Sequence, residues 1–196
     1  MKHVITALVM NEPGVLAHVA GMFAARGFNI DSLVVGRTED PNLSRMTIVT
    51  IADDRTLDQV RKQLAKIVTV VKVRDYKDVP FVSRDLMLVK VRSSPATRGE
   101  IIELTNLFRG HVVDVGANSI IIQLSGEEEK FEAFVELVRP YGILELGRTG
   151  VVAMARGADS LRNPGGDEVA TGKPQRATLP GKRQPTQEEI EATPPG

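Results

Sequence analysis

A short stretch near the N-terminus has the residue types of an anion-binding turn. The sequence NEPGVL at residues 11–16 follows an alternating apolar run at 4–10 and precedes apolar residues spaced i, i+3, i+4 and i+7. It therefore lies between a strand and a helix. The first N–H groups of a helix lack internal partners and lie at the positive end of its dipole, so they can hold a carboxylate or phosphate. Gly14 lets a ligand approach the backbone, and the Asn11 amide can donate and accept hydrogen bonds.

The same stretch also has a purely structural interpretation. Asn11 is of the residue types that cap helices, Pro13 suits a first helical turn, and Gly14 eases the bend. The stretch alone does not distinguish between a cap and a binding site, and it does not identify the anion.

Composition excludes several classes of function. The 196 residues contain 25 Lys and Arg, 25 Asp and Glu, three His and no Cys. The zero net charge argues against a generally basic nucleic-acid binder. The lack of cysteine excludes disulfides, cysteine-based zinc sites and thiol nucleophiles. The histidines are scattered without metal-ligand spacing, and no nucleophile-elbow, P-loop or dinucleotide-binding string is present, so we expect no catalytic residues and no metal site.

No apolar run is long enough to cross a bilayer, and the N-terminus does not look like a signal peptide. We therefore expect a cytoplasmic protein without a membrane partner.

The first 76 residues show the order β-α-β-β-α-β, which is typical of a ferredoxin-like domain. The apolar periodicities predict four strands, at 4–10, 30–35, 46–50 and 68–73, and two helices, at 14–26 and 57–67.

The same order returns in the second part of the chain. Residues 109–114 repeat the layout of residues 26–31. The second copy has predicted strands at 86–91, 111–115, 120–124 and 143–155, and predicted helices at 101–108 and 131–141. The fold class is therefore α+β, with two tandem ferredoxin-like βαββαβ domains.

Four regions follow from this pattern. Residues 1–76 form the first domain, 77–84 a linker that contains Pro80, and 85–157 the second domain. The last 39 residues, 158–196, hold six of the eleven prolines, five glycines and no aromatic residue, so we predict a disordered tail.

The RNA-recognition motif shares this order of elements. RNA binding on such a sheet needs aromatic rings on the central strands, where bases stack. The candidate central strands, 45–51 and 119–124, contain no aromatic ring, so the sequence disfavours RNA binding.

Several segments together resemble the small, regulatory subunit of acetolactate synthase, also called acetohydroxyacid synthase. The resemblance covers residues 1 to about 157 in order and spacing. The segments that carry it are Asn11-x-x-Gly14-x-Leu16, 26–33 (RGFNIDSL), 43–48 (LSRMTI), 85–91 (DLMLVKV) and 148–152 (RTGVV).

The resemblance implies a non-catalytic subunit. Its N-terminal domain would be an amino-acid-binding ACT domain that forms a homodimer, with the two sheets side by side. The chain would activate the large catalytic subunit, a transferase, and confer feedback inhibition by valine in branched-chain amino-acid biosynthesis. No cofactor is expected in this chain; thiamine diphosphate, Mg²⁺ and FAD would belong to the large subunit.

The resemblance also assigns a ligand to the turn. Valine would lie across the dimer interface, between the turn of one chain and residues 29–30 of the other. The residues implied are Asn11, Gly14, Val15, Leu16, Asn29 and Ile30. The second copy lacks the Asn and Gly pair of the turn, so we predict no valine site there; by analogy, residues 85–157 help contact the large subunit.

Two other functions remain open at this point. The chain could be a stand-alone ACT-domain amino-acid sensor with a different partner. It could also be an enzyme in its own right, although no catalytic constellation supports this.

Overall fold

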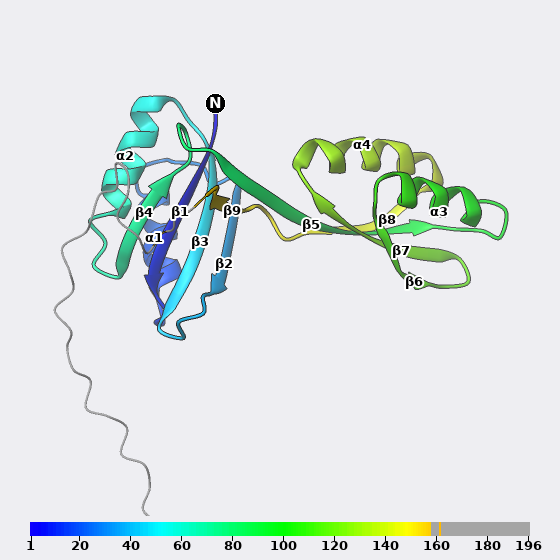
Figure 1. The fold of residues 1–196 in the computed structure, drawn as a ribbon, viewed down its shortest axis with the longest axis horizontal. Helices are drawn as coiled ribbons and strands as arrows, with labels where there is room; N and C mark the ends of the chain where they lie inside the picture. Colours follow the sequence, from blue (N-terminus) through cyan, green and yellow to red (C-terminus); the bar gives the residue numbers. More distant parts are fainter. Residues whose placement is uncertain (158–160, 162–196) are drawn as a thin grey trace, which may run out of the picture.

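The computed structural model describes residues 1–157 and Leu161. Two α+β domains follow one another, each a β-sheet with two helices on one face, as Figure 1 shows. The predicted tandem ferredoxin-like architecture is confirmed. The predicted disordered tail, 158–196, lies outside the described residues, apart from that leucine.

The first domain is a four-stranded antiparallel sheet with the order β2-β3-β1-β4. Its elements are β1 (Lys2–Met10), α1 (Val15–Ala24), β2 (Ser32–Arg37), β3 (Leu43–Ile51), α2 (Asp54–Leu64) and β4 (Val70–Asp75). One side of the sheet contributes residues such as Ile5, Val9 and Ile48 to a core that α1 and α2 cover. The strand β2 lies at an edge of the sheet.

Residues with suitable side chains or backbone freedom lie at the ends of both helices. The Asp53 carboxylate accepts a hydrogen bond of 2.7 Å from the Thr56 N–H and so caps α2. Gly27 follows α1 with φ +66°, a conformation that glycine adopts without strain.

The second domain repeats this arrangement with the strand order β6-β7-β5-β8. Its elements are β5 (Phe81–Arg92), α3 (Arg98–Leu107), β6 (His111–Val115), β7 (Ser119–Gly126), α4 (Glu128–Val138), the 3-10 turn η1 (Arg139–Tyr141), β8 (Ile143–Arg148) and β9 (Val152–Ala155). The three glutamates at 127–129 form the N-cap and first turn of α4, where negative charge is favourable.

The two copies end their first helices differently. In the second copy, the left-handed residue is Arg109, at φ +51°, and not the following glycine. Gly110 is needed for close approach instead, because a Cβ there would lie 3.1 Å from the Gln123 carbonyl oxygen and 3.1 Å from Thr105 Cγ2.

The prediction of one strand over 143–155 is wrong. β8 and β9 are separate, and Gly150 lies between them with φ +88°, which extended backbone does not allow. Both strands nevertheless pair with β5: β8 with residues 87–91 and β9 with residues 81–84.

The stretch taken as a linker, 77–84, is partly regular structure. Its last four residues begin β5 and pair with β9. Just before this stretch, the hydroxyl of the buried Tyr76 donates to the Ala153 carbonyl oxygen at 3.3 Å. The centroids of the Tyr76 and Phe81 rings are 5.0 Å apart. The connection between the domains is therefore fixed at both ends.

Candidate functional site

The turn at 11–16 opens α1 as predicted, with a glycine at the critical position. Gly14 is the N-cap, at φ +85°, and no side chain caps the helix. A Cβ on Gly14 would find no atom within 4 Å, so the space beside this helix start is open. The helix has no acidic residue in its first turn, and the Val15 N–H makes only a long hydrogen bond, 3.5 Å to the Glu12 carbonyl oxygen. The N–H groups here can therefore donate to an anion without competition from a carboxylate of that turn.

Asn11 does not cap the helix. Its side-chain Nδ2 donates to the Pro41 carbonyl oxygen at 2.9 Å, and its Oδ1 accepts from the Ser44 hydroxyl at 3.1 Å. Its backbone N–H donates to the Asn42 carbonyl oxygen at 2.7 Å. Asn11 therefore ties the turn to the loop between β2 and β3. Nothing in the local sequence pattern indicated these partners.

The two residues after Gly14 differ in exposure: Val15 is buried and Leu16 is exposed. Val15 is 4% exposed and packs into the core, so only its backbone can face the turn. Leu16 is 46% exposed and presents an apolar side chain beside the helix start. An anion with an apolar group attached would therefore find both features at this turn.

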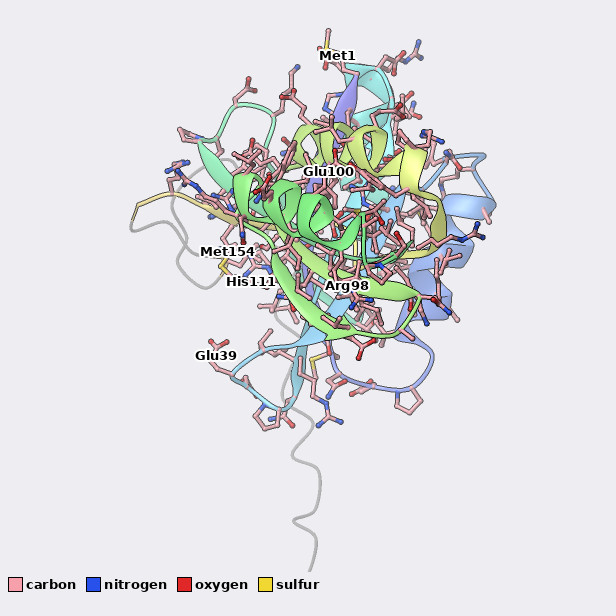
Figure 2. All side chains as sticks on the ribbon, turned by 90° about the vertical axis from the view of Figure 1, so that its right-hand side faces the viewer. Met1, Glu39, Arg98, Glu100, His111 and Met154 are labelled. Atoms are coloured by element: carbon pink, nitrogen blue, oxygen red, sulfur yellow. The ribbon has the colours of Figure 1, made fainter. Side chains whose placement is uncertain are left out.

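Asn29 and Ile30 lie at the other end of α1. Asn29 is exposed, and its carbonyl oxygen accepts from the Thr50 hydroxyl at 2.7 Å; Ile30 packs half-buried against the first core. A ten-residue helix is about 15 Å long. Figure 2 shows Met1, near the end where β2 begins, opposite Glu39 in the β2–β3 loop. One chain therefore does not bring the two predicted halves of the site together.

The equivalent turn of the second copy is closed by its own side chains. The N-cap of α3 is Thr97, and its hydroxyl accepts from the Ser94 N–H at 3.0 Å. Arg98, labelled in Figure 2, donates at 2.9 Å to the carbonyl oxygens of both Gly116 and Ala117. Gly99 in the first turn of this helix also has open space beside it, but Glu100 adds a carboxylate to that turn, and no glycine holds the N-cap position as Gly14 does in α1.

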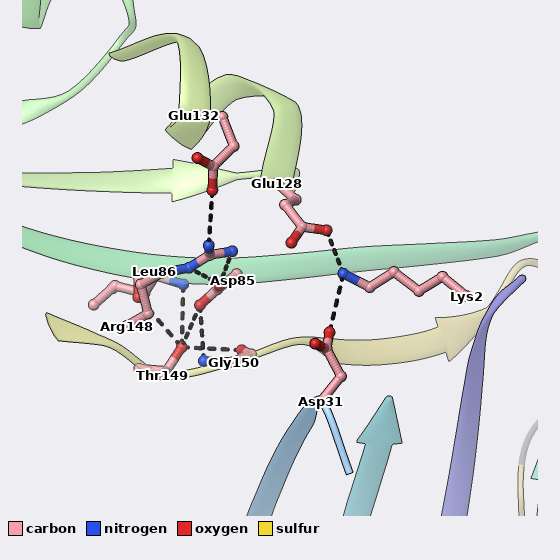
Figure 3. Close-up of polar contacts among 9 residues, drawn as sticks. All are labelled: Lys2, Asp31, Asp85, Leu86, Glu128, Glu132, Arg148, Thr149 and Gly150. Carbon is pink, nitrogen blue, oxygen red and sulfur yellow. Dashed lines mark hydrogen bonds and ion pairs between the residues drawn. The ribbon is translucent and has the colours of Figure 1, made fainter. Parts of the chain in front are cut away.

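A polar cluster between the domains was not recognised in the sequence. At its centre, the Asp85 side chain is 2% exposed. Its carboxylate accepts hydrogen bonds from Arg148 Nε, the Thr149 hydroxyl and the Gly150 N–H, each at 2.9 Å (Figure 3). Arg148 also pairs with Glu132 of α4 at 3.3 Å. Residues 148–150 belong to a segment that carries the resemblance, and the apolar pattern predicts them as strand.

A second ionic contact crosses the same interface. The Lys2 ammonium pairs with Asp31 at 3.4 Å and with Glu128, the first residue of α4, in Figure 3. Burial lowers the pKa of Lys2, but the hydrogen bonds and charges of Glu128 and Asp31 outweigh it, so the pKa is raised overall. Lys2 is therefore a cation at neutral pH.

The described residues contain no group of three or more His, Asp or Glu side chains that could hold a metal ion. The His3 ring is buried, and its Nε2 lies within hydrogen-bond distance of the Ala52 carbonyl oxygen, at 3.1 Å. No helix in the described part of the chain is long and apolar enough to cross a membrane.

Comparison with known proteins identifies the family. The chain is 55% identical over 157 residues to a probable acetolactate synthase small subunit from Archaeoglobus fulgidus, covering 80% of this chain and 98% of the relative. The chain belongs to the acetolactate synthase small-subunit family. Residues 84–157 match the family model for the small subunit of acetolactate synthase, and residues 5–72 match the ACT domain of small subunits of this enzyme. The predicted resemblance is confirmed.

Other members of the acetolactate synthase small-subunit family agree. The small subunit from Mycolicibacterium smegmatis is 48% identical over 155 residues, covering 79% of this chain and 91% of the relative. The crystal structure of the small subunit from Thermotoga maritima superposes with a TM-score of 0.75 at 42% identity, covering 80% of this chain and 98% of that one.

Proposed function

We propose that this chain is the regulatory subunit of an acetolactate synthase, that it activates the large catalytic subunit, and that it makes that subunit sensitive to valine. The observation that carries this proposal is the open, uncapped helix start at Gly14 in a chain of the small-subunit family. By analogy with the family, thiamine diphosphate, Mg²⁺ and FAD would be held by the large subunit.

Valine matches the chemistry of the turn. The N–H groups at the start of α1, of Gly14, Val15 and Leu16, would hold the carboxylate, with Val15 giving up its 3.5 Å hydrogen bond to the Glu12 carbonyl oxygen. Each Asn11 Oδ1 has one acceptor position left after its bond to Ser44, and this position, with Asn29 of the other chain, would receive the ammonium group. Leu16 would contact the isopropyl group.

The strand β2 explains how a dimer would complete the site. β2 is an edge strand, and its free edge can pair with the same edge of a second copy. In an antiparallel pair, the start of β2 in one chain lies beside the end of β2 in the other. Asn11 ties its turn to residues 41–44, just beyond that end. The dimer would therefore bring Asn29 and Ile30 of one chain near the turn of its partner.

Substitution of Gly14 by Asp tests the site. A carboxylate at this position would occupy the open space and repel the ligand's own carboxylate. We expect Gly14→Asp to abolish valine inhibition of the enzyme reconstituted with its large subunit, and to abolish valine binding in calorimetry.

Gly14→Asn is the matched control, since asparagine has a similar size and also tolerates a positive φ. We expect it to weaken inhibition less than the aspartate does, because only the charge differs. Unchanged inhibition of the aspartate variant would place valine elsewhere.

A stand-alone ACT-domain sensor is the alternative. The match of residues 84–157 to the small-subunit model favours the enzyme subunit, since a sensor with another partner has no need for this second domain. Co-purification distinguishes them: the regulatory subunit should retain a large thiamine-diphosphate protein from its own host, and a sensor should not.

A further inference from the structure

The Lys2 contact joins three segments through one side chain. Lys2 is the first residue of β1, Asp31 directly precedes β2, and Glu128 begins α4 of the second domain. We call this set of three residues the Lys2 bridge. It is the point at which the backbone of the proposed effector segment, residues 29–30, is linked through charge to the second domain.

The position of Asp31 makes the bridge sensitive to that segment. Asp31 follows Ile30 immediately, and its N–H donates to the Val49 carbonyl oxygen at 2.8 Å. A ligand that moves Asn29 or Ile30 would also move the Asp31 carboxylate, because these residues share one short connection between α1 and β2. The Lys2 ammonium must then follow Asp31 or remain with Glu128.

The neighbouring Asp85 cluster provides a fixed reference for such a change. Its carboxylate is buried and fully bonded, and it holds residues 148–150 against β5. Gly150 lies so close to β2 that a Cβ would be 2.4 Å from the Ser32 Oγ. The interface therefore has a rigid part, at Asp85, and an adjustable part, at Lys2.

The exposure of the bridge suits a switch better than a structural support. The Lys2, Asp31 and Glu128 side chains are 39%, 37% and 44% exposed. Exposed ion pairs shift an equilibrium by at most about fivefold, which is too little to hold two domains together but reaches the lower end of the range of allosteric coupling.

We propose that the Lys2 bridge transmits occupancy of the effector site to the second domain, and that Lys2 is a positioning residue for regulation. This inference rests on the proposed function. It assigns to the bridge the coupling between the two domains, whereas Gly14 and its neighbours bind the effector. Two ion pairs of α4 lie at this interface: Glu128 with Lys2 in the bridge, and Glu132 with Arg148 in the Asp85 cluster. Both glutamates lie in the first turns of α4, so this helix would receive the change.

Lys2→Met in the full chain tests the proposal, because methionine keeps an unbranched stem and removes the charge. We expect valine to bind this variant with an affinity within about twofold of the wild type, since Lys2 does not belong to the proposed site. In the reconstituted enzyme, the ratio of activity without valine to activity at saturating valine should fall by up to about fivefold. Lys2→Arg should restore the ratio.

Lys62→Met is the matched control. Lys62 pairs with Asp58 at 2.6 Å, but both residues belong to α2, so the loss of this ion pair does not affect the interface. We expect wild-type regulation. Glu128→Gln should reproduce Lys2→Met, and the double variant should lose no more than either single variant.

Three results would overturn the proposal: an unchanged ratio in Lys2→Met, an equal loss in Lys62→Met, or a loss of valine binding in Lys2→Met with the fold intact. The wild-type titration separates this proposal from the proposed function. If wild-type enzyme shows neither valine binding nor inhibition, the proposed function fails; if only the variants disagree, the bridge alone does.

Discussion

Single residues at the domain boundary have roles that burial and geometry define. Asp85 is a buried carboxylate whose charge is compensated by the Arg148 guanidinium and by two further donors, so removing any partner leaves buried polar atoms unsatisfied. Gly150 supplies one of those donors and also adopts a backbone conformation that other residues rarely adopt. Both residues are needed to turn the chain from β8 to β9 beside the first domain.

Gly150→Ala should destabilise the protein by about 1–3 kcal/mol. The φ of +88° is strained for alanine, and the new Cβ would lie 2.4 Å from Ser32 Oγ and 2.9 Å from Val34 Cγ2. Urea unfolding followed by circular dichroism measures the change. Gly147→Ala is the control, because a Cβ there meets no atom within 4 Å and the backbone is a regular strand. Equal stability of the two variants would contradict this account.

At the scale of elements, the helices begin by different means although the two domains repeat. α2 has a true side-chain cap at Asp53, whereas Glu127 holds the same position before α4 without a capping hydrogen bond. Hydrogen bonds from the Thr56 side chain and N–H lower the pKa of Asp53. The folded state therefore favours the ionised carboxylate, and this stabilisation is present above the unfolded pKa and is lost as the pH falls through the folded one.

Asp53→Ala should lower the melting temperature at pH 7, because the Thr56 N–H loses its acceptor. The difference from wild type should shrink as the pH falls through the lowered pKa of Asp53, where the wild-type carboxylate becomes protonated. Thermal melts at pH 7 and at acid pH measure both effects. Glu127→Ala removes an exposed ion pair with Arg84 and one charge at a helix start, but no capping hydrogen bond, so it should change the melting temperature less. A pH-independent difference for Asp53→Ala would refute the role of its charge.

At the scale of the whole molecule, the two sheets present similar edges with different predicted uses. Val35 on β2 is 41% exposed and Val113 on β6 is 50% exposed, and each strand is the edge of its sheet. The proposed effector site requires two first domains to pair through β2. No such requirement applies to β6.

Val35→Lys should weaken self-association by at least about tenfold, because a two-fold axis would place two new charges near each other at the paired edges. Sedimentation equilibrium of the full chain measures the dissociation constant. Val113→Lys places the same change at the matching edge of the second sheet and should leave association unchanged. If only the β6 variant dissociates, the dimer forms through the second domain.

The sequence by itself determined the two βαββαβ domains, the strand-to-helix turn at Gly14 and the family. These features follow from local patterns, since apolar periodicity and helix-end residues act over a few neighbours. The sequence pattern predicts one strand over 143–155, because apolar residues continue on both sides of Gly150 and give no sign that the strand ends there.

Only the tertiary structure decided how Asn11 is held, where β8 ends, and which charges meet between the domains. The Asp85 carboxylate binds Arg148 and Gly150, which lie more than 60 positions later in the sequence. Lys2 of the first domain pairs with Glu128 of the second. Such polar contacts have no period along the sequence. They depend on where two separately formed domains come to lie, and that placement is set by the packing of β5, β9 and Tyr76.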